Sequence, residues 1–305
     1  MKILFFGLGS IGQRHLINLQ TILSERNVKA TIEAFRSRPS TEEQDRSSAV
    51  KMLYHPEEIV GDYDIVFITN PTDQHYSTLV SMSDRAKYFF IEKPVFETVK
   101  DVKGLIDKNE QCYIACPLRH KLIYKKLNQI IHDNVVQSAR VIASSYLPNW
   151  RTSDYRTSYS AQSHQGGGVE LDCIHELDYI IDLFGLPKQS YSVIKKVSSL
   201  EINSNDHASY ILDYDDKVVV LHLDYYGKYN QRNIELITEQ GLITVNLIEN
   251  SISLNGEVIE TLPEEINDFY MNEMNYFMDM VLQGADNINT LKQSLDTLKI
   301  AIGKV

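Results

Sequence analysis

Short apolar runs alternate with amphipathic stretches along the first part of the chain. A run over residues 2–6 ends at Gly7, and apolar residues recur at helical spacing from Ile11 to about Leu23. The same alternation predicts further strands at 30–35, 64–69, 88–91 and 112–116, with helices at 72–82 and 101–108. Strands that alternate with helices are typical of a parallel, doubly wound sheet with right-handed crossovers. We therefore expect an α/β fold here.

The pattern changes after about residue 120. Long strands follow one another with few helices between them, at 135–146, 190–197, 208–214, 217–225, 233–238 and 242–247. Helices are expected at 168–184 and at about 266–282. Such a series predicts a large, open, mostly antiparallel sheet flanked by helices. We accordingly expect two domains, one over residues 1–120 and one over residues 121–305.

Charge and cysteine content narrow the class of protein. The chain has 305 residues and a net charge of −11, which argues against a general nucleic-acid binder. Three cysteines without C-x-x-C spacing argue against a disulfide framework or a zinc knuckle and fit a reducing cytosol. No apolar run approaches the roughly 20 residues that span a bilayer. We expect a soluble, cytoplasmic protein with neither a nucleic-acid nor a membrane partner.

The first strand ends in a glycine turn, Gly7-Leu8-Gly9-Ser10-Ile11-Gly12. This G-x-G-x-x-G motif follows a strand and opens a helix, which is the context that makes it a dinucleotide-binding signal. Gly7 permits the tight turn, Gly9 lets the backbone approach a pyrophosphate, and Gly12 lets the helix pack on the strand. With Ser10 and Ile11 they form the expected cofactor cradle. The competing interpretation is a tight strand–helix turn alone.

The tip of the second strand bears on which cofactor binds. An acidic residue there would bind the 2′-hydroxyl of NAD, but the sequence has Arg36-Ser37-Arg38, and Glu33 lies inside the strand. Two arginines and a serine suit a 2′-phosphate. This favours NADP, with NAD as the alternative; a solvated loop is the competing interpretation.

Three segments together resemble the Gfo/Idh/MocA oxidoreductase family: residues 7–15, Glu92-Lys93-Pro94 and residues 166–178. The resemblance covers nearly the whole chain. It implies a dinucleotide-binding Rossmann domain over 1–120 and a substrate-binding and oligomerisation domain over 121–305. Members of the family typically move hydride between a tightly held NAD(P) and a sugar, inositol or related polyol. Many are dimers or tetramers, so the resemblance implies a homodimer or homotetramer.

Glu92-Lys93-Pro94 matches the E-K-P motif of that family. The resemblance places Glu92 and Lys93 beside the cofactor, and the Lys93 ammonium is expected to hydrogen-bond the reacting oxygen. In the family the peptide bond before Pro94 is often cis.

Residues 70–75, which follow the strand predicted at 64–69, match a second family signature. The resemblance implies that Asn70, Pro71 and His75 line the ribose or nicotinamide side of the cofactor. A buried structural histidine, or one that caps the helix, is the alternative for His75.

Asp172 and His175 are the candidate acid–base pair. They resemble the D-x-x-H-E-x-D variant of the family, and residues three apart share a helix face. Histidine titrates near neutrality, so His175 can take a hydroxyl proton as hydride leaves. Lys93 is the rival proton relay. Asp172 either contacts substrate or orients the imidazole, and both Asp172 and His175 are expected at the substrate with Lys93.

A polar, aromatic segment over residues 146–160 leads into the glycines before Asp172. Trp150, Tyr155 and Tyr159 are suited to stack on a sugar face, while Arg151 and Arg156 are suited to hold a carboxylate or phosphate. An ordered structural loop is the alternative. Arg119 matches a family arginine and is a further candidate for contact with substrate or cofactor.

These features lead to one expected function and one alternative. We expect an NAD(P)-dependent oxidoreductase that acts on the CH–OH group of a carbohydrate: a sugar, a sugar acid or a nucleotide sugar. The D-x-x-H-E subgroup resembles enzymes of surface-polysaccharide sugar biosynthesis. The alternative is a regulatory or scaffold protein of the same fold that binds the cofactor without turnover. The scattered histidines and acids indicate no metal site.

Overall fold

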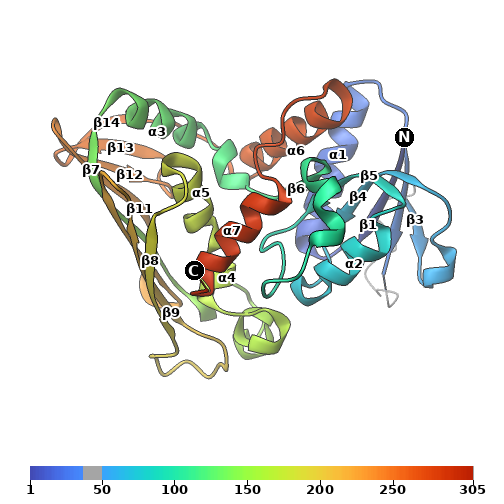
Figure 1. The fold of residues 1–305 in the computed structure, drawn as a ribbon, viewed down its shortest axis with the longest axis horizontal. Helices are drawn as coiled ribbons and strands as arrows, with labels where there is room; N and C mark the ends of the chain where they lie inside the picture. The colour runs from blue at the N-terminus through green and yellow to red at the C-terminus, as the bar shows by residue number, and fades with distance from the viewer. Residues whose placement is uncertain (37–49, 305) are drawn as a thin grey trace. The chain divides into compact units, whose positions relative to one another are not determined.

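The computed structural model describes residues 1–36 and 50–304, so the predicted cofactor residues Ser37 and Arg38 lie outside the described part. The chain forms two compact units (Figure 1). The first comprises Met1–Ala115 and Tyr270–Ser294. The second comprises Cys116–Phe269 and the chain from Leu295 onward. The change of pattern near residue 120 thus lies close to the division, but the return of residues 270–294 to the first unit has no counterpart in the predicted boundaries.

The first unit contains a six-stranded sheet in which every neighbouring pair of strands is parallel. Its order is β3-β2-β1-β4-β5-β6. The strands are β1 (Lys2–Phe6), β2 (Thr31–Phe35), β3 (Val50–Leu53), β4 (Tyr63–Ile68), β5 (Ala86–Ile91) and β6 (Cys112–Ile114). The predicted doubly wound parallel sheet is confirmed. Strand β3, which follows a polar stretch, was not among the predicted strands.

Helices α1 (Ser10–Glu25) and α2 (His75–Met82) connect strands of this sheet. Three 3-10 segments belong to the same unit: η2 (Pro56–Glu58), η3 (Thr72–Gln74) and η4 (Lys103–Gln111). The core stacks aromatic rings across neighbouring strands, with the Phe5 and Phe67 centroids 4.2 Å apart. Phe277, from helix α6 (Ile266–Gln283), meets Phe67 edge-on at 5.7 Å. The apolar strand runs thus become the buried centre of the unit.

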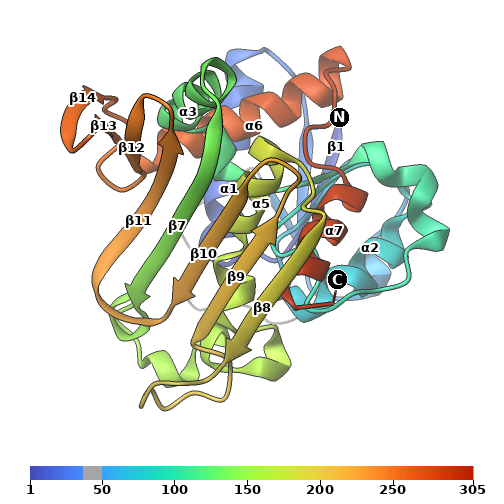
Figure 2. The same cartoon turned by 60° about the vertical axis from the view of Figure 1, so that its left-hand side comes forward.

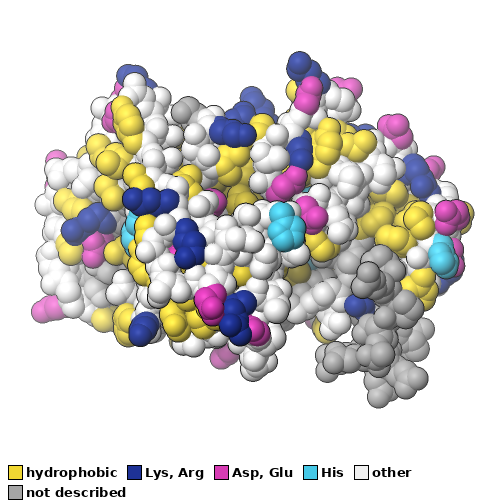
Figure 3. Space-filling model, turned by 90° about the horizontal axis from the view of Figure 1, so that it is seen from below, with side chains coloured by type: hydrophobic (Ala, Val, Ile, Leu, Met, Phe, Trp, Pro, Cys, Tyr) yellow, Lys and Arg dark blue, Asp and Glu magenta, His cyan; other side chains and the backbone are white. Residues whose placement is uncertain are grey.

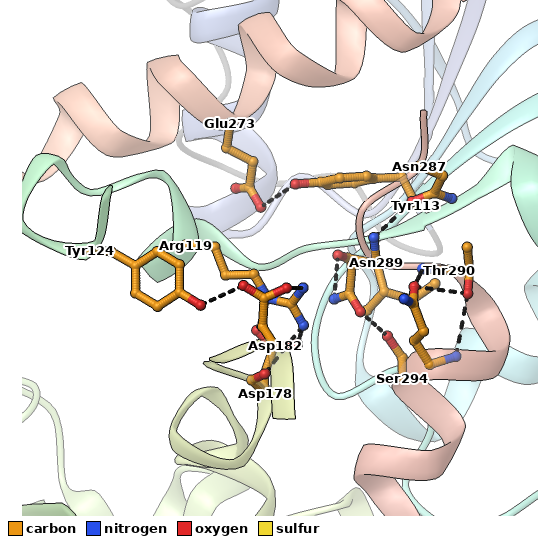
Figure 4. Close-up of polar contacts among 12 residues, drawn as sticks. Tyr113, Arg119, Tyr124, Asp178, Asp182, Glu273, Asn287, Asn289, Thr290 and Ser294 are labelled. Atoms are coloured by element: carbon orange, nitrogen blue, oxygen red, sulfur yellow. Dashed lines mark hydrogen bonds and ion pairs between the residues drawn. The ribbon is translucent and has the colours of Figure 1, made fainter. Parts of the chain in front are cut away.

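Polar contacts connect residues 270–294 to strand β6 (Figure 4). Asn287 donates to the carbonyl oxygen of Cys112 over 2.8 Å, and Asn289 donates to that of Ile114 over 3.0 Å. Tyr113, between them in sequence, donates to Glu273. These side-chain amides satisfy backbone carbonyls at the edge of the sheet, where no further strand pairs.

The second unit contains an eight-stranded sheet of order β14-β13-β12-β11-β7-β10-β9-β8. Only the pairing of β7 with β10 is parallel, so the predicted large, mostly antiparallel sheet is confirmed. The strands are β7 (Val136–Tyr146), β8 (Gln189–Lys195), β9 (His207–Asp213), β10 (Val218–Asp224), β11 (Tyr226–Thr238), β12 (Gly241–Asn246), β13 (Ser251–Leu254) and β14 (Glu257–Thr261).

Helices cover one face of this sheet (Figures 1 and 2). They are α3 (Leu122–Asp133), α4 (Val169–Asp172), α5 (Ile174–Phe184) and α7 (Leu291–Ala301). Short 3-10 segments supply the loops: η5 (Pro117–His120), η6 (Leu147–Asn149), η7 (Tyr155–Thr157), η8 (Tyr159–Ala161) and η9 (Ser163–Gln165). Along β9, Tyr210 is buried toward the helices while Ile211 is 49% exposed on the opposite face. This alternation is what a sheet covered on one side requires.

Among the described residues, no helix is long and apolar enough to cross a membrane. On the face drawn in Figure 3, acidic and basic side chains are interspersed, and no basic stripe crosses it.

Candidate functional site

The glycine turn of the first unit has the geometry of a dinucleotide cradle. Gly7 has a φ of +90°, and a Cβ there would lie 2.8 Å from the backbone of Asn70. A Cβ on Gly12 would lie 2.6 Å from the carbonyl oxygen of Gly7, so both positions need glycine. Gly9, in contrast, has no neighbouring atom within 4 Å of its would-be Cβ. Backbone is therefore open to a ligand where the motif predicts pyrophosphate.

The start of helix α1 adds favourable electrostatics to this cradle. Gly9 is the N-cap, no side chain caps the helix, and its first turn holds no acidic residue. Ser10 is exposed and Ile11 is half-buried beside it. Uncapped backbone N–H groups and the positive end of the helix dipole favour an anion. The residues present thus fit the pyrophosphate of a dinucleotide.

Three predicted site segments meet at one edge of the parallel sheet. Gly7 follows β1, Asn70 follows β4 and Lys93 follows β5, and these three strands are adjacent in the order β1-β4-β5. The strand order reverses beside β1, which makes this the position where doubly wound sheets bind ligands. Pro71 is exposed there and Lys93 is half-buried. The topology therefore gathers the predicted cofactor residues of this unit.

The Lys93 turn is supported by a buried ion pair. Glu92 Oε1 lies 2.5 Å from His15 Nε2, and Glu92 Oε2 accepts a hydrogen bond from the Lys93 backbone N–H at 3.2 Å. Burial disfavours the charged form of Glu92, but the hydrogen bond and charge of His15 outweigh it, so the pKa of Glu92 is lowered. The Lys93–Pro94 peptide bond is cis, as the resemblance implies. Glu92 was predicted as a cofactor contact; here it orders the turn that carries Lys93.

His75 connects the two loops beside the cradle. Its Nε2 lies 2.9 Å from the carbonyl oxygen of Asn70, and its Nδ1 lies 3.1 and 3.3 Å from those of Pro94 and Val95. The imidazole is buried, and burial is the main cause of its lowered pKa. These contacts fit the alternative of a buried structural histidine, which holds the Asn70 loop against the Lys93 turn.

Only Arg36 of the predicted 2′-phosphate residues lies in the described part. It is half-buried, and its backbone N–H donates to Leu53 at the end of β3. Glu33 points away from the strand tip: its carboxylate accepts from Tyr63 at 2.6 Å and from Lys51 at 3.2 Å. The one acid of β2 is therefore engaged inside the unit.

In the second unit, the segment that carries Asp172 and His175 is almost entirely enclosed. Residues 166–180 are buried with one exception, His175, which is half-buried. The glycines make this close packing possible, because a Cβ on Gly167 would lie 2.2 Å from the carbonyl oxygen of Tyr159. Asp172 ends α4 and His175 lies in the first turn of α5. The accessible group of the segment is thus the predicted acid–base histidine.

Asp172 receives hydrogen bonds from two phenols. Tyr225, fully buried after β10, donates to Asp172 Oδ2, and Tyr159 of η8 also donates to this carboxylate. Burial and the charge of Asp172 raise the pKa of Tyr225, so it stays protonated and acts as a donor. Tyr225 lies 53 positions from Asp172 in sequence. No local motif could have indicated this contact.

Arg119 is enclosed by acidic side chains of α5 (Figure 4). Its Nε and Nη2 donate to the two carboxylate oxygens of Asp178 over 2.8 and 2.7 Å, and its Nη1 donates to Asp182 over 2.6 Å. Asp182 also accepts from Tyr124 of α3. Burial disfavours the charge of Arg119, but these carboxylates outweigh it and raise its pKa. Arg119 was predicted as a ligand contact, and these bonds also connect it to the helix that carries His175.

The predicted substrate segment divides into two groups. Trp150 donates to Ser145 and meets the Tyr225 ring edge-on at 5.2 Å, while Arg151 lies over the Tyr159 ring. Trp150 and Arg151 thus contact the two tyrosines that donate to Asp172.

The second group comprises Tyr155 and Arg156. The Tyr155 hydroxyl accepts from the Glu201 backbone, and Arg156 pairs with Asp154 and Glu201 on an exposed surface. The structure therefore associates Trp150, Arg151 and Tyr159 with the candidate acid–base pair, and places Tyr155 and Arg156 in a separate set of polar contacts.

Two buried acids beside the pair have partners that the sequence did not indicate. Glu176 is fully buried and pairs with Arg232 of β11 at 2.7 Å, and Glu170 accepts from Asn205 at 2.7 Å. Burial raises the pKa of Glu170 to about 6. Glu176 thereby connects α5 to the sheet.

Comparisons with known families agree with this arrangement. Residues 1–113 match the sequence model of an oxidoreductase family with an NAD-binding Rossmann fold. Residues 124–244 match the model of the Gfo/Idh/MocA C-terminal domain. Together the two models match more than two thirds of the chain, so the resemblance inferred from the motifs is confirmed.

Individual relatives are distant but span the chain. The chain is 21% identical over 317 residues to scyllo-inositol 2-dehydrogenase (NAD(+)) of Bacillus subtilis. This match covers 97% of the chain and 90% of the relative. An oxidoreductase of Thermotoga maritima matches with a TM-score of 0.82 at 20% identity, covering 100% and 95% of the two chains. The WlbA dehydrogenase of Bordetella pertussis, solved with NADH and UDP-GlcNAcA, matches with a TM-score of 0.77 at 14% identity, covering 100% and 96%.

Proposed function

The chain belongs to the Gfo/Idh/MocA oxidoreductase family, and we propose that it is an NAD(P)-dependent dehydrogenase acting on a CH–OH group of a carbohydrate. One observation carries this proposal. The glycine cradle, Asn70 and Lys93 lie at the ends of three adjacent parallel strands, which is where such a sheet binds a dinucleotide and its reaction partner. The names of the relatives, an inositol dehydrogenase and a dehydrogenase solved with a nucleotide sugar, support the carbohydrate class.

The cofactor would be held by the first unit. Gly7, Gly9, Ser10, Ile11 and Gly12 would receive the pyrophosphate at the start of α1. Asn70 and Pro71 would lie beside the ribose or nicotinamide. When bound, NAD(P) supplies the hydride acceptor or donor of the reaction.

The chain's own residues would bind the reacting oxygen of the substrate and transfer its hydroxyl proton. Lys93 would hydrogen-bond the reacting oxygen and stabilise the charge that develops on it. His175, the accessible residue of an otherwise buried segment, would accept the hydroxyl proton in the direction of oxidation and return it in the other. Asp172, with its two phenol donors, would position the reacting groups.

The cofactor preference that we propose is NADP. The acid of β2 is engaged by Tyr63 and Lys51, which leaves no carboxylate at the strand tip for a ribose 2′-hydroxyl among the described residues. Arg36 lies at that tip, and Ser37 and Arg38 follow it in sequence. Guanidinium groups bind phosphate better than they bind a hydroxyl. NAD, the cofactor in the name of the B. subtilis relative, is the alternative.

We further propose that the protein is a cytoplasmic homodimer or homotetramer. The sheet face without helices exposes a set of apolar side chains on three adjacent strands, Tyr191, Val193, Ile211, Val218 and Val220. A contiguous apolar patch of this kind is typical of a subunit interface. The three cysteines are buried and form no disulfide bond, which suits a reducing compartment. Light scattering coupled to gel filtration measures the assembly directly.

Retained cofactor and turnover test the function. Native mass spectrometry of freshly purified protein should find NADP or NAD bound. Absorbance at the reduced-nicotinamide band should then rise when inositols, sugar acids or nucleotide sugars are added with the oxidised cofactor. Bound cofactor without any change across this panel, together with a tight protein partner, would instead favour a regulatory or scaffold role.

A further inference from the structure

The two arginines of the segment before the catalytic pair have opposite surroundings. Arg156 is neutralised: its Nε and Nη2 donate to Asp154 over distances of 2.8 to 3.0 Å, and its Nη1 donates to Glu201 over 3.0 Å. Arg151 is exposed and forms no hydrogen bond or ion pair with any residue in the ranges 1–36 and 50–304. Its guanidinium is therefore available to a ligand, and that of Arg156 is not.

Arg151 is held next to the predicted reacting groups by an aromatic contact. Its guanidinium carbon lies 5.1 Å from the centroid of the Tyr159 ring, and the Tyr159 hydroxyl donates to Asp172. A cation over the face of an aromatic ring is attracted to it, which orients the guanidinium. A single tyrosine ring thus connects Arg151 to the carboxylate of the candidate acid–base pair.

No acidic side chain among residues 1–36 and 50–304 pairs with the Arg151 guanidinium. The charge of Asp172 is the largest influence on Tyr159 and raises its pKa, whereas the charge of Arg151 acts in the opposite direction. Asp172 accepts hydrogen bonds from two phenols and forms no ion pair with Arg151. The chain as a whole carries a charge of −11, so a general excess of basic residues does not account for the unpaired charge of Arg151. Its planar, forked donors suit carboxylate or phosphate oxygens.

We propose that Arg151 binds an anionic group of the substrate, and that the substrate is therefore a negatively charged sugar rather than a neutral polyol. This inference rests on the proposed function for the site that it extends. The shared chemistry is an oxyanion, which is supplied by a uronic acid carboxylate, by a sugar phosphate, or by the diphosphate of a nucleotide sugar. Arg151 would hold that group while Trp150 and Tyr159 contact the sugar.

Calorimetric binding to NADP-loaded protein tests the proposal without relying on turnover. The probes are D-glucose, D-glucuronate, glucose 6-phosphate and UDP-N-acetylglucosamine, and the proteins are wild type, Arg151→Ala, Arg151→Lys and Arg156→Ala. At least one anionic probe should bind wild type about tenfold or more tightly than glucose. Arg151→Ala should lose about tenfold to a hundredfold in affinity for that probe. Arg151→Lys should lose part of this, and Arg156→Ala should match wild type within about twofold, as expected of an exposed ion pair.

The probe that depends on Arg151 identifies the source of the oxyanion. Anionic probes that bind no better than glucose, or equal losses in Arg151→Ala and Arg156→Ala, would overturn the proposal. Turnover measured in the same samples separates it from the proposed function. Oxidation of glucose or inositol that is at least as efficient as that of every anionic probe refutes the anion site alone, whereas Arg151-dependent binding without reduction of the cofactor by any sugar refutes the dehydrogenase alone.

Discussion

Arg119 and Asp178 form a buried, bidentate salt bridge, with Nε–Oδ2 and Nη2–Oδ1 distances of 2.8 and 2.7 Å. Asp178 lies one helical turn beyond His175 on α5, and Asp182 of the same helix binds the third guanidinium nitrogen, Nη1. On the opposite side, Glu176 binds Arg232 of the sheet. Two arginines thus fix the helix that presents the candidate proton acceptor, and Arg119 acts through this helix.

Replacing Asp178 with Asn should leave the Arg119 charge buried with a weaker partner. Removing one member of a buried ion pair costs about 3–5 kcal/mol, so we expect a large fall in the midpoint of thermal unfolding. Turnover at temperatures where the variant is folded should also fall, because α5 is less firmly positioned. Asp154→Asn, in an exposed ion pair, is the matched control and should unfold like wild type. If both variants unfold at the wild-type temperature, the Arg119 contacts do not position α5.

Tyr225→Phe should impair the reaction more than it impairs binding. The substitution removes one of the two donors to Asp172, and a lost hydrogen bond to a charged group costs about 1.5–3 kcal/mol. We expect kcat to fall about tenfold or more, whereas retained cofactor, measured by native mass spectrometry, should be unchanged because Tyr225 belongs to the second unit. Leu223→Ala on β10, also fully buried, controls for a general loss of packing. An unchanged kcat with only a lower unfolding midpoint would make Tyr225 purely structural.

The raised pKa of Glu170 predicts how the free energy of unfolding depends on pH. Its pKa rises from an ordinary 4.5 to about 6 on folding, chiefly because it is buried, so folding takes up a proton between these values. The contribution of this group to stability is therefore greatest below about pH 4.5 and falls as the pH rises through 6, by about 2 kcal/mol in total. Glu170→Gln carries no such charge and should be more stable than wild type at pH 7.5 but not at pH 4.5. A stability difference between Glu170→Gln and wild type that is the same at both pH values would contradict this prediction.

The cofactor preference has its own measurement. Wild type should bind NADP more tightly than NAD, and Arg36→Ala should weaken NADP binding about tenfold or more while leaving NAD binding nearly unchanged, since each charge-assisted hydrogen bond contributes about 1.5–3 kcal/mol. Fluorescence of the bound reduced cofactor measures both affinities. Lys29→Ala in the first unit, away from the strand tip, serves as the control. NAD bound at least as tightly as NADP by wild type would show that Arg36, Ser37 and Arg38 do not form a 2′-phosphate site.

Local sequence patterns were sufficient to predict those strands whose position is determined by an apolar run. The runs at 2–6 and 64–69 predicted β1 and β4 within a residue, because buried parallel strands are apolar throughout. A hairpin and a helix that were not predicted also had local signals. Asn255-Gly256, both with positive φ, forms the turn between β13 and β14. Thr290 and Gln293 form a reciprocal capping box at the start of α7.

The site depends on contacts between distant parts of the chain, and there the sequence was less informative. The glycine turn and Lys93 carry a local motif, but the partner of Glu92 is His15, 77 positions away. The same holds for Arg119 and Asp178, which are 59 positions apart. An arginine that binds substrate and an arginine that binds a buried carboxylate look alike in sequence. Only the fold separates Arg119 and Arg156, which are paired with acids, from Arg151.

The most direct test of the account compares single-turnover reduction of the cofactor by wild type, Lys93→Ala and His175→Ala. A substrate identified from inositols, sugar acids and nucleotide sugars is mixed with cofactor-loaded protein, and absorbance at the reduced-nicotinamide band is followed. We predict that wild type develops the band and that each variant, still folded and still holding cofactor, loses at least about a hundredfold in rate, since general acid–base catalysis contributes roughly 10²–10⁴-fold. Wild-type rates in both variants would contradict the proposed roles of Lys93 and His175.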